Sequence, residues 1–261
     1  MTNSLQTNTG THTKEGIPGS TLKIIAIVSM LIDHIAAIIL NDYLMQNIDL
    51  LQSTQVPKHL LVAYYTTFAM RCIGRLAFPL FCFLLIEGYV HTHNKWKYAG
   101  RLFLFAIISE IPFDIANKQV ILEFTYQNVF FTLCIGLVVI ILYEEITKRF
   151  EASKIKVVLL QSLVMVAGIL LALLLKTDYN CIGVLTIITM YHFRHNRKKE
   201  ILFGSIALIM VGIIEILALA IIPLVTRYNG KRGIRLKYVF YLFYPVHLLL
   251  LSLISYLLGF R

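Results

Sequence analysis

Charged side chains are scarce in this chain. Only 15% of its 261 residues are Asp, Glu, Lys or Arg, whereas 58% are hydrophobic and the mean hydropathy is +0.75. Soluble domains carry about a quarter charged residues, so the composition excludes an ordinary soluble globule. The apolar residues occur in blocks of about twenty, the length at which a helix crosses a bilayer. The sequence therefore predicts an all-α fold, a polytopic bundle of membrane helices.

Cysteines and long polar segments are also few. The four cysteines are widely spaced inside apolar blocks, so we expect no disulfide, zinc or redox motif and interpret them as core-filling residues. Residues 1–20 are polar and are predicted to form a disordered tail. No loop is long enough to bury a core of its own, so we expect 21–261 to form a single integral membrane domain.

Apolar segments divide this domain into eight candidate spans, and we expect eight to ten membrane helices around a polar cavity. The spans are 21–41, 61–90, 98–116, 128–147, 155–175, 179–193, 200–226 and 237–258. The second is long for one straight crossing, and we expect a bend near Pro79.

Basic residues indicate the orientation of the chain. Lys and Arg number 24 against 14 Asp and Glu, and they cluster in alternate short loops, which predicts a cytoplasmic N-terminus rather than nucleic-acid binding. The loop 227–237 is basic, yet eight simple crossings would place it outside. Either 200–226 folds as a hairpin that returns to the same side, or these cations serve chemistry outside the cytoplasm; we favour the hairpin.

Ionisable residues within the first span are candidates for function, because charge at bilayer depth is costly. Lys23 and His34 are eleven residues apart, which places them nearly on one stripe and about 16 Å apart along the axis. A cation at the membrane edge could hold a phosphate group while His34 meets a reactive group deep in the bilayer, as a general base. A snorkelling lysine and a structural histidine are the alternatives. The neighbouring Asp33 is expected to bind Arg71 or Arg75.

Arg71 and Arg75 share one helical face in the second span. Two guanidinium groups so close need anionic partners, which could be protein carboxylates, lipid headgroups or a nucleotide phosphate. Glu87 and His91 are predicted to pair at the end of this span. His91 and His93 have poor spacing for a metal, and we expect no metal site.

The third span ends with Glu110 and Asp114 on one face across Pro112. These acids could bind a cation, hold the two arginines or receive an amine; we favour the arginines. Nearby Gln127 and Asn128 are interpreted as helix caps.

Two further candidates lie near the C-terminus. The turn 228–233 carries Lys231 and Arg232 between glycines whose backbone could donate to an anion. Tyr244 and His247 are three residues apart in the last span and can face one cavity, although a hydrogen bond between helices is an equal alternative.

With these residues assembled, the chain resembles the TraX family of membrane proteins, named for pilin acetylation in conjugation. The resemblance covers nearly everything from Thr21 onwards. It rests on the blocks Leu31-Ile32-Asp33-His34, Gly74-Arg75-Leu76-Ala77-Phe78-Pro79, Ser109-Glu110-Ile111-Pro112-Phe113-Asp114, Gln127-Asn128-Val129-Phe130-Phe131 and Phe243-Tyr244-Pro245-Val246-His247.

A remoter likeness links the chain to the acyltransferase-three group of integral membrane acyltransferases. That group has a basic residue, ten intervening positions and a histidine in its first helix, as at Lys23 and His34. Its arginines are two residues apart, whereas Arg71 and Arg75 have three residues between them.

The resemblance implies a multi-pass protein of the bacterial inner membrane that acts as an acetyltransferase. Acetyl-CoA would be the donor, and the acceptor would be the N-terminal amine of a pilin-like peptide or a hydroxyl of an envelope glycan. In this hypothesis His34 is the base, helped by Asp33, Glu110, Tyr244 and His247. The donor phosphates would be held by Lys23, Arg71, Arg75, Lys231 and Arg232.

Two other classes of function are open. One is a proton-coupled transporter or flippase that uses the intramembrane acids and His34 as a relay. The other is a non-catalytic assembly factor that docks pilin-like helices in the membrane.

Overall fold

The first membrane helix is longer than the hydropathy pattern predicts. The computed structural model describes residues 16–234 and 237–261, so most of the predicted tail lies outside the described residues. Helix α1 (Gly19–His34) runs directly into a π-helical segment, η1 (Ile35–Leu40), and then into α2 (Asn41–Gln46). A single turn, α3 (Ile48–Leu51), follows. His34 therefore lies where the α-helical hydrogen-bond ladder changes to the π pattern, a feature often found at functional sites.

The second span is broken close to Pro79, where a bend was expected. Helix α4 (Lys58–Gly74) ends and α5 (Ala77–His91) begins across Arg75 and Leu76. Pro79 lies just after this break, in the first turn of α5, where its missing N–H costs no hydrogen bond. Gly74 lets the end of α4 approach α1 closely, because a Cβ there would lie 2.0 Å from Oδ1 of Asp33.

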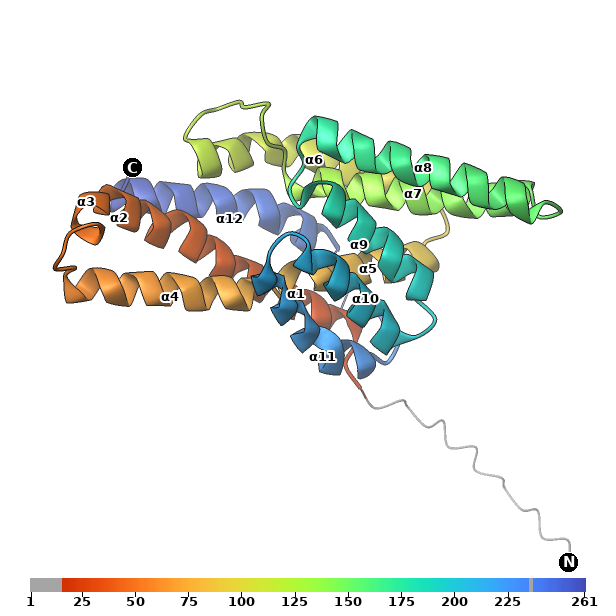
Figure 1. Cartoon of the computed structure of the whole chain (residues 1–261), viewed down its shortest axis with the longest axis horizontal. Coiled ribbons are helices and arrows are strands. Elements are labelled where there is room, and N and C mark those ends of the chain that lie inside the picture. The colour runs from red at the N-terminus through yellow and green to blue at the C-terminus, as the bar shows by residue number, and fades with distance from the viewer. Residues whose placement is uncertain (1–15, 235–236) are drawn as a thin grey trace, which may run out of the picture.

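The remaining elements confirm an all-helical bundle. They are α6 (Lys95–Lys118), α7 (Val129–Arg149), α8 (Lys154–Leu175), α9 (Asn180–Phe193), α10 (Arg197–Ile209), the 3-10 helix η2 (Ile213–Ile221), α11 (Ile222–Thr226) and α12 (Lys237–Leu257). Within the described residues, five helical segments are long and apolar enough to cross a membrane, and α9 and the η2–α11 segment are shorter apolar helices. Figure 1 shows α7 and α8 as an antiparallel pair and α4, α12 and the α1–α2 helix side by side.

The segment predicted as the span 200–226 folds back on itself. Helix α10 ends before Gly212, and η2 and α11 then pack against α10. As a result, the start of α10 and the segment after α11 come together, with the Arg197 guanidinium 5.4 Å from the centre of the Tyr228 ring. The hairpin that we favoured is therefore present, and it returns the chain to the end of the bundle at which α10 starts.

Basic loops gather at one end of the molecule. Lys95 forms an ion pair with Glu144, Arg197 lies 2.8 Å from Glu87, and the backbone N–H of Ile17 donates to the carbonyl of Arg227 at 2.8 Å. These contacts place the start of α1 beside the loops before α6 and α10 and after α7 and α11; we call this region the basic end. The opposite end joins Arg261 to Asp42 at 2.5 Å.

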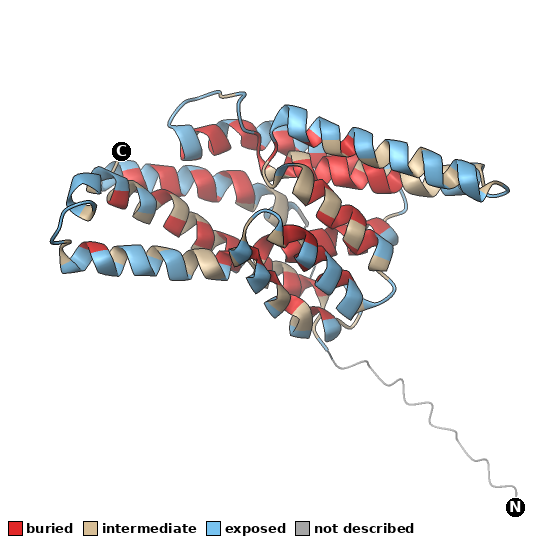
Figure 2. Cartoon of the chain, viewed as in Figure 1, coloured by how far each residue is buried: buried red, intermediate tan, exposed pale blue. Residues whose placement is uncertain are grey.

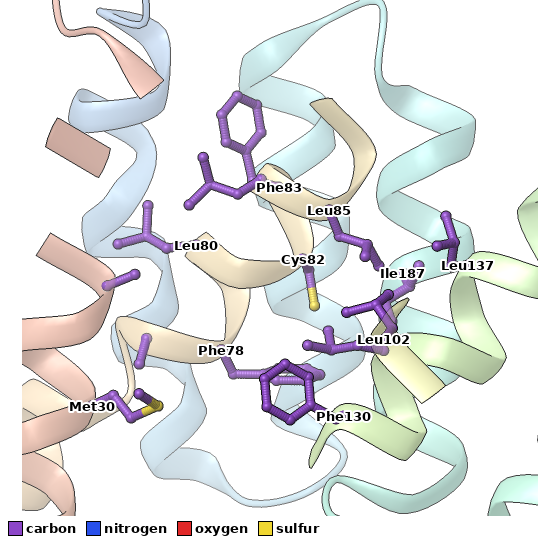
Figure 3. Packing of buried hydrophobic residues seen from close by; sticks show 14 of the residues in the cluster. Met30, Phe78, Leu80, Cys82, Phe83, Leu85, Leu102, Phe130, Leu137 and Ile187 are labelled. Atoms are coloured by element: carbon purple, nitrogen blue, oxygen red, sulfur yellow. The ribbon is translucent and has the colours of Figure 1, made fainter. Parts of the chain in front are cut away.

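The apolar core centres on α5. Its side chains pack between α1, α7 and α9, with Leu80 and Phe83 fully buried (Figure 3). Ile86, on the same helix, is fully buried as well. By contrast, most of α4 and α8 is exposed (Figure 2). Such apolar outer faces are expected where lipid takes the place of water.

Candidate functional site

Two histidines from opposite ends of the chain meet inside the bundle. Nδ1 of His34, at the end of α1, lies 2.6 Å from Nε2 of His247 on α12, and the two rings are stacked with centroids 4.9 Å apart. His247 is buried, while His34 retains partial exposure. The sequence predicted both residues as candidates but gave no reason to pair them.

Hydrogen bonding fixes which nitrogen of each ring holds the proton. Nδ1 of His247 lies 2.6 Å from the carbonyl oxygen of Phe243, and because a carbonyl only accepts, this Nδ1 is the donor. In the neutral ring, Nε2 of His247 is then an acceptor, so Nδ1 of His34 must donate to it. The proton of His34 thus sits on Nδ1, and its Nε2 has a free lone pair. Nε2 makes no hydrogen bond to any described residue.

Tyr244 borders this pair and connects it to the start of α7. Its ring lies edge-on to His34, with centroids 6.1 Å apart, and it is almost fully buried. The Tyr244 ring also packs edge-on against Phe130 in the first turn of α7, with centroids 5.2 Å apart.

Glu110 contacts Asn128 rather than the arginines we favoured. Nδ2 of Asn128 donates to one Glu110 oxygen and, at 2.7 Å, to the carbonyl of Ala106. Oδ1 of Asn128 accepts from the N–H of Phe130 at 3.0 Å, so the predicted cap is present as well. The other oxygen of Glu110 is buried without a partner among the described residues. Asn128 binds Glu110 in place of the arginines because it lies opposite Glu110, at the point where α7 starts against α6.

The arginine pair is bound by carboxylates. Asp33 accepts from Arg71 and, at 2.9 Å, from Arg75, as the sequence predicted for this acid. Arg75 also donates to Glu215 of η2 at 2.7 Å. Two cations and two carboxylates close a neutral cluster, which we call the arginine cluster. Because both guanidinium groups are held this way, a donor-phosphate role for Arg71 and Arg75 would require their ion pairs to open.

Lys23 and His34 face the same helix. The Lys23 ammonium lies 5.2 Å from the centre of the Phe240 ring, and His34 contacts His247 seven residues further along α12. Phe240 and His247 are two turns apart and share a face. The predicted common stripe on α1 is therefore present, with Lys23 toward the basic end.

The other predicted residues lie away from the histidines. The side chains of Lys231 and Arg232 are exposed at the basic end. The backbone carbonyls of these two residues accept from the N–H groups of Gly19 and Ser20 at 2.8 and 3.0 Å, so this turn caps α1 instead of offering donors to an anion. Asp114 accepts from the backbone N–H of Glu123 at 2.7 Å and holds a loop.

Two buried acids were missed by the sequence interpretation. Glu215 and Glu200 are both about 1% exposed or less, and both lie in the segment that was treated as one apolar span. Glu200 lies 3.3 Å from Arg197, which also binds Glu87. An acid in an apolar block is itself a signal, since such residues need a cationic partner. Across the described residues, no group of three or more His, Cys, Asp or Glu side chains could hold a metal ion.

Comparison with known proteins places this arrangement in a family. The family model described as TraX protein matches residues 18–255. The probable fimbrial assembly protein FimC, serogroup H1, of Dichelobacter nodosus is 29% identical over 256 residues, which cover 88% of this chain and 92% of that protein. No solved structure matches the chain. Because the model spans most of the chain, including both histidines and the whole arginine cluster, this protein belongs to the TraX family.

Proposed function

We propose that this protein is a membrane acyltransferase that modifies a component of a pilus or fimbria, with His34 as its general base. The observation behind the proposal is the orientation of His34 by His247. An imidazole whose Nδ1–H is held by an acceptor presents an unprotonated Nε2 of fixed direction, which is what proton removal from an acceptor requires.

The chemistry follows from that free nitrogen. Nε2 of His34 takes the proton from an acceptor amine or hydroxyl as the acceptor attacks the carbonyl carbon of an acyl thioester. The new N–C or O–C bond forms as the C–S bond breaks, and the thiolate takes the proton back from Nε2. His247 remains the hydrogen-bond acceptor throughout and stabilises the imidazolium that forms between these two proton transfers.

Charge placement suits a donor that enters from the basic end. Lys23 lies on the His34 face of α1, about 16 Å nearer that end, and the exposed Lys231 and Arg232 lie beside the start of α1. A phosphate-bearing donor such as acetyl-CoA would find its cations here, while its thioester extended along the stripe toward His34. Arg71 and Arg75 would then position Asp33, the chain neighbour of His34, rather than bind the donor.

The acceptor is inferred from the relative. Because that protein is named for fimbrial assembly, we propose as acceptor the N-terminal amine of a pilin-like peptide, with a hydroxyl of an envelope glycan as the alternative. Both the amine and the hydroxyl lose a proton when they attack the thioester.

Transfer of label from acetyl-CoA tests the proposal. Purified protein is given labelled acetyl-CoA and a pilin-like peptide, and the product is measured by intact mass. His34→Ala should lower the rate by 10²–10⁴-fold, the usual contribution of a general base. His59→Ala, at the exposed start of α4, is the matched control and should leave the rate unchanged. Undiminished transfer by His34→Ala would overturn the assignment of the base.

A second test uses His247. A Gln side chain offers an oxygen that can accept from Nδ1–H of His34, whereas Leu offers none. We therefore expect His247→Gln to retain more activity than His247→Leu. Equal loss in the two variants, with equal melting temperatures, would contradict the orienting role of His247.

A non-catalytic assembly factor is the second candidate. It is favoured by the arginine cluster, because four groups that neutralise one another serve to hold α1, α4 and η2 together without any donor. This alternative predicts binding of a pilin-like helix with no binding of acetyl-CoA. Equilibrium measurements of both ligands with the same preparation separate the two functions.

A further inference from the structure

A cavity away from the histidines opens at the basic end between α7, α8 and α9. Its volume is about 860 Å³. One wall is apolar and includes Val158 and Met165 of α8 and Leu185 and Ile188 of α9. The mouth is polar and includes Lys95 and Arg194. From Leu185 to Arg194 the cavity extends about 14 Å along α9.

The cavity forms because α8 and α9 pack closely near the loop that joins them and diverge toward their other ends. Toward the connection between them, α8 packs tightly, since a Cβ on Gly168 would lie 2.6 Å from Val139, and Ala172 is fully buried. Toward the basic end α9 diverges from the α7–α8 pair (Figure 1). There Nε2 of Gln161 on α8 donates to the Thr147 hydroxyl at 3.0 Å and to the Tyr143 carbonyl at 3.3 Å, which ties α8 to α7 rather than to α9.

Arg194 supplies a positive charge with no carboxylate within ion-pair distance among the described residues; Glu200 acts on it from further away and is itself paired with Arg197. Of the charged side chains around the cavity, Lys95 binds Glu144, which also binds Lys148 at 2.7 Å. Arg194 forms no ion pair within the described part of the chain. Its guanidinium lies 4.1 Å from the centre of the Tyr191 ring, and one Nη donates to the Tyr191 carbonyl at 2.9 Å. The group is therefore held in place while its remaining N–H groups stay available to a ligand.

We propose that this cavity binds an anionic phospholipid. The net charge of the lining is +1 when the histidines are neutral, because Lys95 and Arg194 face the single carboxylate of Glu144. This charge of +1 balances the single negative charge of one phosphodiester, whose oxygens can accept two parallel hydrogen bonds from an arginine guanidinium. An acyl chain would lie along the apolar wall below the phosphate. The exposed face of α8 leaves the cavity next to the lipid, so the ligand enters from the bilayer. This inference is independent of the proposed catalysis.

Lipid titration tests the site. Full-length protein in neutral detergent is titrated with phosphatidylglycerol or phosphatidylcholine of identical acyl chains, and bound lipid is counted by native mass spectrometry. We expect phosphatidylglycerol to bind more tightly. Arg194→Gln should weaken its binding about tenfold or more, as for the loss of a charge-assisted hydrogen bond. Arg149→Gln is the matched control, an exposed arginine at the same end whose guanidinium contacts the Phe150 ring.

Two further measurements distinguish binding of the acyl chains from binding of the phosphate alone. Met165→Trp fills the apolar wall and should weaken binding of phosphatidylglycerol even though Arg194 is intact. Glycerol phosphate has the anion without the chains and should compete poorly. Equal effects of Arg194→Gln and Arg149→Gln, or equal binding of the two lipids, would overturn the proposal. Effective competition by glycerol phosphate would replace it with a site for soluble phosphate esters.

Discussion

Removing the charge of Arg75 should destabilise the protein, and removing Glu215 as well should recover most of the lost stability. Arg75 has a side chain only 12% exposed, between Asp33 at 2.9 Å and Glu215 at 2.7 Å. In Arg75→Met, Asp33 keeps Arg71, but Glu215, with a side chain 1% exposed, is left without a cation. The arginine cluster then carries a net charge of −1 in place of zero.

The expected size follows from what an unpaired buried charge costs. Removing one partner of a buried ion pair costs about 3–5 kcal/mol. For a chain of this size that corresponds to a melting temperature lowered by roughly 6–20 °C. Glu215→Met should cost a similar amount, because it leaves the cluster at +1. The double variant returns the charge to zero and replaces the pair by apolar side chains, which is often nearly neutral.

A double-mutant cycle of melting temperatures in detergent measures this coupling. Arg71→Met is the control, because its side chain is 37% exposed and Asp33 retains Arg75 in its absence, so we expect a smaller loss. If the double variant lost as much as the two single variants together, Arg75 and Glu215 would not be acting as a pair. A loss below about 1 kcal/mol for Arg75→Met would place the pair among solvent-screened surface contacts.

Two further outcomes test the packing and the topology. Gly74→Ala should lower the melting temperature, because its Cβ would lie 2.0 Å from Oδ1 of Asp33, whereas Gly100→Ala, with no atom within 4 Å, should leave it unchanged or raise it slightly. In cells, a Cys at Asn229 should react with a membrane-impermeant thiol reagent from the cytoplasmic side only, and a Cys at Ser53 from the opposite side only; the same sidedness at both positions would contradict the hairpin.

Most of the fold could be predicted from hydropathy, because the length of an apolar run directly reflects the thickness of the bilayer. Hydropathy does not report where a helix changes its hydrogen-bond pattern, so the π-helical segment after His34 was not visible. The bend expected near Pro79 is present as the break across Arg75 and Leu76. The proline indicated that a break lies close by, because a proline is tolerated in the first turn of a helix but not in its interior, yet it did not identify the residues at which α4 ends.

The candidate site was predictable where electrostatics restricts the choice of partner. Asp33 needs a cation in the membrane, and Arg71 and Arg75 were the nearest arginines in sequence, which gave the correct contact. Glu110 faced the same requirement, yet an amide on the facing helix satisfies it. Such a choice depends on how α6 and α7 are rotated against each other. The pairing of His34 with His247 likewise depends on the register between α1 and α12, which are more than 200 residues apart.

The arginine cluster and the His34–His247 pair are neighbours in the bundle, and both must satisfy buried polar atoms, but they do so in different ways. The arginine cluster balances two cations against two carboxylates, although one oxygen of Glu215 is buried without a partner among the described residues. In the histidine pair, each neutral ring has one donor and one acceptor nitrogen. His34 donates to His247, and His247 donates to the Phe243 carbonyl. The acceptor nitrogen of His34 is then left without a hydrogen bond. That acceptor is Nε2 of His34. Under the proposed function, this free nitrogen on a partly exposed residue is the atom to which the proton donor would bind.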